Sequence, residues 1–137
     1  MLFLPNRHPF VAAFAVAAAL SLGTAVFAQN APGPVRTVLA RQDATAPGYE
    51  AVAVRVEIPV GGREGRHTHP GVAMGVVEQG TLTLDYEGRP TTDYKPGDVF
   101  MLEAGKVHEG INKGSVPVKV VATFVITKGA TITMPAK

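Results

Sequence analysis

The sequence predicts one all-β domain, an antiparallel sandwich or barrel, preceded by an N-terminal export signal. Three observations predict it. Short runs rich in β-branched and aromatic residues alternate with glycine- and proline-containing turns, and no stretch after residue 34 has a helical period of useful length. An apolar segment occupies the start of the chain. The 137 residues are enough for one domain with one modest core.

The first 28 residues have the order of a secretory signal peptide. A short polar and positive start (residues 6–8) precedes residues 10–27, which carry no charge and are rich in alanine, and a cleavage site fits Val26-Phe27-Ala28. The apolar run is just long enough to span a bilayer, so an uncleaved anchor is the alternative. Because alanine inserts weakly, we expect cleavage, no stable membrane span afterwards, and an exported protein that is periplasmic or secreted.

The composition of the remaining chain argues against a nucleic-acid-binding protein and against a fold stabilised by disulfides. Removal of residues 1–28 takes away Arg7, one of 13 Lys and Arg, and none of the 11 Asp and Glu, so the formal net charge falls from +2 to +1. With no basic run and few aromatic residues, the chain has no nucleic-acid footprint. It has no cysteine. Stability of an exported form must therefore come from packing or a metal, not from disulfides.

The expected domain follows a flexible tether at residues 29–34 and covers residues 35–137. Alternation is clearest at residues 49–58, where every second residue from Val52 to Ile58 is apolar and shares one face. Lys95-Pro96-Gly97-Asp98 suits a type II turn, because proline sets the first central position and glycine supplies positive φ at the second. The expected strands are residues 35–41, 49–58, 74–79, 81–87, 99–102, 107–112 and 118–127.

Three of the four histidines lie at strand starts or edges beside turns. On a strand, His67 and His69 point the same way, roughly 7 Å apart along it, so both imidazoles can converge on one metal. Such a site needs a further ligand, and His108 is the remaining histidine after the signal. The alternative for His67 and His69 is exposure in a Gly- and Pro-rich loop, and spacing alone does not bring His108 to them.

At these residues the sequence resembles a small single-domain cupin of type 2. Eight positions match the spacing of the two cupin motifs: Gly61, His67, His69 and Gly80 in the first, and Gly97, Gly105, His108 and Asn112 in the second. The resemblance covers about residues 52–127 and implies a jelly-roll barrel that holds a metal inside, near one end. It further implies that the three histidines are ligands, that the four glycines serve turns, and that Asn112 is structural or faces the pocket.

The chain departs from the cupin motifs at two positions. Ala73 stands where the family usually has a glutamate ligand, and the alternative spacing puts Met74 there but brings Gly80 one residue early. Glu103 replaces the proline of the second motif, and we interpret it as a solvated turn carboxylate. Whether Glu103 or Met74 takes the place of the missing ligand stays open at this point.

Three neutral imidazoles offset none of the charge of a divalent transition metal and leave two or three positions open. Similarity to three-histidine cupins, among them thiol dioxygenases and a diketone-cleaving enzyme, implies an oxygenase-like enzyme. Iron is the expected metal, with zinc, copper, nickel and manganese as alternatives. The competing reading is a non-catalytic cupin that binds a metal or a small molecule. A sensor half of a transcription factor fits poorly, since the sequence has no DNA-binding helix pair.

The expected partner is a small chelating or anionic organic molecule in a largely apolar cup. Arg63, Arg66 and Lys106 flank the histidines and are candidates for a cationic rim that attracts carboxylates or phenolates, the alternative being ordinary surface charge. The resemblance alone implies a homodimer. Residues 118–127 are apolar on both faces near Val121 and are expected either in the interface or between the sheets.

Overall fold

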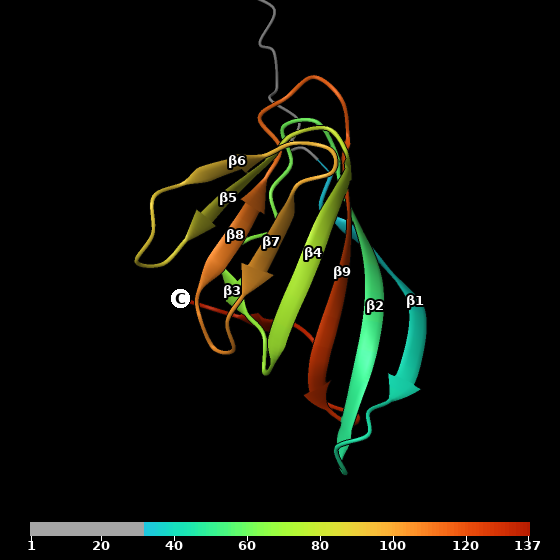
Figure 1. Ribbon diagram of the computed structural model, residues 1–137. Helices are drawn as coiled ribbons and strands as arrows, with labels where there is room; N and C mark the ends of the chain where they lie inside the picture. Colours follow the sequence, from blue (N-terminus) through green and yellow to red (C-terminus); the bar gives the residue numbers. More distant parts are fainter. Residues whose placement is uncertain (1–31) are drawn as a thin grey trace, which may run out of the picture.

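The computed structural model describes residues 32–137, which form two antiparallel sheets of five strands each (Figure 1). The predicted signal peptide, residues 1–28, and the first part of the predicted tether lie outside the described residues. Within the described range, no helix has the length and apolar character needed to cross a membrane. The all-β prediction is confirmed.

One sheet has the order β1-β2-β9-β4-β7, and the other has the order β10-β3-β8-β5-β6. Strands far apart in sequence are thus neighbours, as β9 lies between β2 and β4. The strands expected from the sequence do not include β6 and β10, and the strand assumed for His67 and His69 is reduced to the two residues of β3. The bounds are β1 (Val35–Asp43), β2 (Tyr49–Ile58), β3 (His67–Thr68), β4 (Val72–Gln79), β5 (Leu82–Tyr86), β6 (Thr92–Tyr94), β7 (Val99–Leu102), β8 (His108–Ile111), β9 (Val118–Thr127) and β10 (Met134–Pro135).

The core lies between the sheets and follows the alternation of β2 and β9. Every second residue of β2 from Val52 to Ile58 is buried, as the sequence predicts. In β9 the alternate residues from Val118 to Ile126 are buried against them, so this face of residues 118–127 lies between the sheets. Removal of these apolar side chains from water is the main favourable contribution to folding.

The turns that set the register also match the sequence. The N–H of Asp98 donates to the carbonyl of Lys95 at 2.9 Å, and Gly97 has a φ of 91°, so the predicted type II turn is confirmed. The four motif glycines all have positive φ, a region that residues with a Cβ rarely adopt. They are Gly61, Gly80, Gly97 and Gly105.

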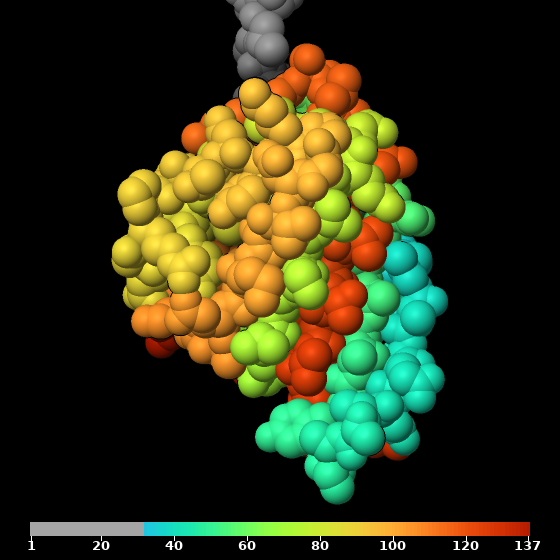
Figure 2. Space-filling model, in the orientation of Figure 1, coloured from blue at the N-terminus to red at the C-terminus, as the bar shows by residue number. Residues whose placement is uncertain are grey.

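The outer face of the first sheet carries exposed apolar side chains. Met74 of β4 is 52% exposed and lies opposite Met101 of β7, while Val72 of β4 lies opposite Val125 of β9. Figure 2 shows these strands side by side on one face of the molecule. Met74 therefore points away from the space between the sheets.

Candidate metal centre

The structure brings together the three histidines that the sequence singles out. His67 of β3 lies directly opposite His108 of β8 in the antiparallel ladder, and His69 follows β3. The ring centroids are 4.4 Å to 4.9 Å apart, and one ring nitrogen of each histidine lies within 4.8 Å of the others. All three side chains are buried. This is the spacing of groups that can share one small cation.

A backbone carbonyl fixes the orientation of each ring. The Nδ1 of His67 lies 2.7 Å from the carbonyl of Gly65. The Nδ1 atoms of His69 and His108 lie 2.7 Å and 2.9 Å from the carbonyls of Ile132 and Lys106. Because a carbonyl only accepts, each Nδ1 carries the proton and donates it, which leaves each Nε2 with a lone pair. Metal-binding histidines are held in this way by their second nitrogen.

The Nε2 atoms of His69 and His108 face each other at 3.2 Å. Burial is the main cause that lowers the pKa of all three histidines, and that of His69 falls to about 4. The rings are therefore neutral near pH 7, and no proton lies between the two facing nitrogens. Two lone pairs at this distance repel each other unless a cation lies between them. The donor set thus fits a divalent transition metal.

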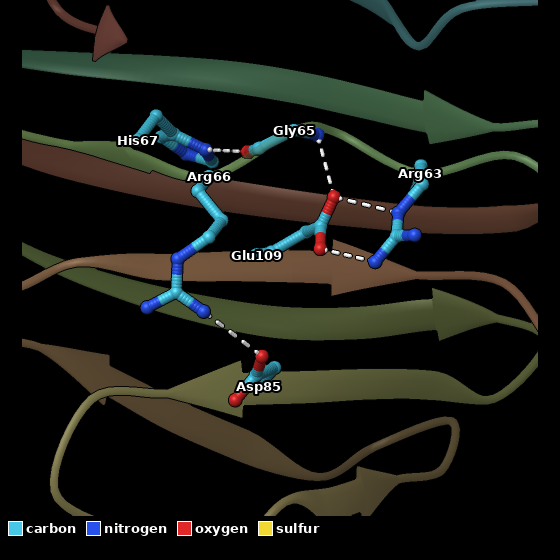
Figure 3. A network of polar contacts seen from close by, with 6 residues as sticks. All are labelled: Arg63, Gly65, Arg66, His67, Asp85 and Glu109. Carbon is cyan, nitrogen blue, oxygen red and sulfur yellow. Dashed lines mark hydrogen bonds and ion pairs between the residues drawn. The ribbon is translucent and has the colours of Figure 1, made fainter. Parts of the chain in front are cut away.

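A buried carboxylate behind β8 supports His67 (Figure 3). Glu109 points away from the histidines, as the alternation after His108 predicts, and accepts hydrogen bonds from Arg63 Nε at 2.8 Å and from the Gly65 N–H at 3.0 Å. The same Gly65 presents its carbonyl to His67. The two peptide groups on either side of the Gly65 Cα therefore link the Glu109 carboxylate to the orientation of a candidate ligand.

A cavity of about 110 Å³ extends from the histidines between the sheets. That volume holds several water molecules or a small organic molecule. Apart from the three neutral histidines, the ionisable side chains among the described residues that line it are Arg36 and Glu64. The rest of its lining is almost wholly apolar, as predicted: Val38, Val54, Val56, Ile58, Leu82, Leu84, Phe100, Leu102, Val120, Ala122, Phe124, Ile132 and the polar Thr133.

The sequence model of the Cupin domain matches residues 54–132, more than half of the chain, and spans all three histidines. The chain belongs to the cupin family. A curated relative, the auxin-binding protein ABP20 of Prunus persica, is 30% identical to this cupin over 86 residues, which are 57% of this chain. The chain spans only 40% of that relative's length.

Solved structures show the same fold. An uncharacterized protein with a double-stranded β-helix domain from Klebsiella pneumoniae has a TM-score of 0.61 at 23% identity, covering 77% of this cupin and 86% of that protein. An oxalate oxidase in complex with glycolate has a TM-score of 0.60 at 22% identity, covering 73% and 54%. The lyase DddQ of Ruegeria pomeroyi, which acts on DMSP, has a TM-score of 0.57 at 21% identity, covering 63% and 43%.

The two departures from the cupin motifs have different surroundings. Ala73 is buried in β4, opposite Leu102 and Phe124, which both line the cavity. Met74 is exposed on the outer face, and Glu103 is exposed and forms an ion pair with Arg89. Neither Met74 nor Glu103 belongs to the histidine cluster or the cavity lining. Of the two readings of Glu103, the structure favours the turn carboxylate.

Asn112 has a structural role rather than a place in the pocket. Its buried amide nitrogen donates to the carbonyls of Ile58 and Val116 at 3.0 Å and 2.9 Å, and its oxygen accepts from the Gly114 N–H at 3.0 Å. The side chain thus joins the end of β2 to the loop before β9. Of the two roles that the resemblance implies for it, the geometry supports the structural one.

The three candidate rim cations lie outside the cavity lining. Arg63 pairs with Glu109, and Arg66 pairs with Asp85 at 3.2 Å (Figure 3). Lys106 is exposed and contributes its backbone carbonyl to His108. These contacts are those of ordinary surface charges, and the cationic rim stays a prediction. Sequence reasoning missed Arg36 and Glu64 because no local pattern relates two residues 28 positions apart.

Proposed function

We propose that this cupin binds one divalent transition metal through His67, His69 and His108 and acts as a metal-dependent, oxygenase-like enzyme. Its substrate would be a small chelating or anionic organic molecule. The observation that carries the proposal is the orientation of the histidines. Three buried, neutral rings each bring one nitrogen within 4.8 Å of the others beside an apolar cavity, and two of the Nε2 atoms face each other.

The residues around this point define what the site can do. A metal bound there supplies Lewis acidity and open positions for a chelating molecule and oxygen. Ala73 stands at the position of the usual carboxylate ligand, so β4 contributes no carboxylate to the site. A ligand that fills the cavity is surrounded by apolar walls, and the low dielectric there strengthens every polar contact that the ligand makes.

Iron is the metal that we propose, on the basis of the resemblance to three-histidine oxygenases. Three imidazoles also suit zinc, copper and nickel, and manganese is less favoured without a carboxylate. The test is oxygen uptake by the iron-loaded protein in a screen of small chelating acids and diketones, beside His108→Ala. Uptake that depends on His108 supports an oxygenase. Stoichiometric iron without uptake for any compound would contradict it.

A non-catalytic binding protein is the second candidate. One observation favours it: the position of the glutamate ligand holds Ala73, as it would in a cupin that has kept a binding site and lost its chemistry. The enzyme would convert its ligand into a product, whereas the binding protein would leave it unchanged. Calorimetric binding of a compound, recovered unchanged after incubation with the metal-loaded protein in air, identifies the second candidate.

We also retain two proposals about the state of the protein in the cell. The first is export after cleavage of residues 1–28, which N-terminal sequencing of the protein from a periplasmic fraction tests. The second is a homodimer. Light scattering on the purified protein measures its mass directly, and a monomer across the micromolar range would contradict it.

A further inference from the structure

A single ion pair lies in the apolar lining of the cavity, among the residues that the structure describes. Arg36 comes from the edge strand β1, where it lies opposite the buried Val56 of β2. Glu64 comes from the loop before β3. The Nη2 of Arg36 donates to Glu64 Oε1 at 2.9 Å. Segments 28 residues apart thus place opposite charges in the cavity that also contains the histidines.

The cavity is accessible beside β1. The side chain of Arg36 is 33% exposed and that of Glu64 is 13% exposed, so the guanidinium is the outer member of the pair. Val38, two residues along the same strand, also lines the cavity and is half exposed. A molecule that enters at this edge meets Arg36 before it reaches the histidines.

Arg36 retains capacity to bind a further acceptor. A guanidinium has five N–H donors in a planar fork, and among residues 32–137 its hydrogen bond to Glu64 uses one of them. The fork matches the two oxygens of a carboxylate. The positive charge of Arg36 also contributes to lowering the pKa of His67 and His69, so the guanidinium and the histidines share one electrostatic environment.

We propose that Arg36 binds the carboxylate of a small ligand with an apolar body, and that this carboxylate replaces Glu64 on the guanidinium. Two carboxylates beside one guanidinium in an apolar cavity repel each other, so the ligand and Glu64 compete. The apolar walls take the hydrocarbon part of the ligand. This inference rests on the proposed function only in assigning the ligand to the cavity of the histidine site.

Glu64 is held in place from the β8 side. Its N–H donates to the Gly110 carbonyl at 2.9 Å, and its carboxylate occupies the space that a Cβ on Gly110 would need. The absence of a side chain at Gly110 therefore lets Glu64 lie over β8 and reach Arg36. In the free protein Glu64 occupies the position that the ligand carboxylate takes on binding.

The test compares pentanoate with pentanamide, a neutral analogue of the same shape, by calorimetry on the zinc-loaded protein. We expect pentanoate to bind more tightly than pentanamide. Arg36→Gln should weaken pentanoate about tenfold or more and leave pentanamide unchanged, since a hydrogen bond to a charged group contributes at least that factor. Glu64→Gln should tighten pentanoate binding because it removes the competitor. Arg66→Gln, which removes a cation outside the cavity, is the matched control and should change neither.

Each contrary result overturns the proposal. Absence of pentanoate binding, equal binding of the two compounds, or equal effects of Arg36→Gln and Arg66→Gln removes Arg36 as the binding group. An unchanged pentanoate affinity in Glu64→Gln shows that the ligand carboxylate does not replace Glu64 on Arg36. Melting temperature and zinc content show whether the variants remain folded. The same titration on metal-free His108→Ala separates the two proposals. Arg36-dependent binding that persists without zinc supports the carboxylate site independently of the metal, whereas a parent protein that takes up no zinc but still binds pentanoate through Arg36 refutes only the metal site.

Discussion

The Nε2 atoms of His69 and His108 lie 3.2 Å apart, and both are acceptors, since the Nδ1 proton of each ring is donated to a backbone carbonyl. Burial keeps both rings neutral by lowering their pKa. The fold therefore holds two lone pairs close together, with a ring nitrogen of His67 within 4.8 Å. Such an arrangement is disfavoured by itself and favoured around a cation.

The metal-free protein should lose stability as the pH falls from about 7 toward 4. The unfolded chain takes up protons at its histidines near pH 6.5, while the folded pKa values are lower and that of His69 is about 4. The unfolded state therefore binds more protons in this window, and stability rises with pH. Melting temperatures across this range measure the effect. The variant His69→Gln should show a shallower slope, and equal slopes would contradict the assignment.

Introducing the missing carboxylate should make folding depend more strongly on metal. In the metal-free protein, Ala73→Glu buries an unpaired charge beside Leu102 and Phe124, which should destabilise it by several kcal/mol. A bound divalent cation would offset that charge. Thermal melts with and without Mn²⁺ should show a larger rescue for Ala73→Glu than for the neutral Ala73→Gln. Equal rescue of the two variants would place residue 73 too far from the metal.

Glu109 should influence metal affinity although it points away from the histidines. Glu109→Ala removes the acceptor of the Gly65 N–H and so loosens the carbonyl that orients His67. Loss of such a support typically weakens metal binding 10- to 100-fold, which competition with a chromophoric chelator measures. Glu109→Gln keeps an acceptor oxygen and should recover part of the affinity. Asp85→Ala, which breaks the surface ion pair with Arg66, is the control. If it weakens metal binding as much as Glu109→Ala does, Glu109 does not act through Gly65.

Much of the candidate site follows from alternation along strands and from turn chemistry. The i and i+2 spacing of His67 and His69 places them on one side, and the residues around Gly97 form the expected turn. Alternation also places Met74 on the opposite face from Ala73, where the structure has it. The spacing to Gly80 favours Ala73 over Met74 as the position of the missing ligand, and the exposure of Met74 agrees with that choice.

The rest depends on contacts between distant segments. Arg63 and Arg66 precede His67 in sequence, yet their partners, Glu109 and Asp85, come from β8 and β5 and hold both cations outside the cavity. Arg36 enters the cavity because β1 pairs with β2 in a register that a sequence pattern does not supply. Of the charged residues just before His67 in sequence, Glu64 lines the cavity and Arg63 and Arg66 do not, whereas Arg36 comes from a distant segment.

The metal content of the protein, purified from an export host without chelators beside His108→Ala, tests the three-histidine site most directly. We expect near one transition metal per chain in the parent protein and loss of that metal in the variant. Elemental analysis also identifies the metal. No metal in either protein, with none taken up on titration, would contradict the site and leave a barrel that binds or supports something else.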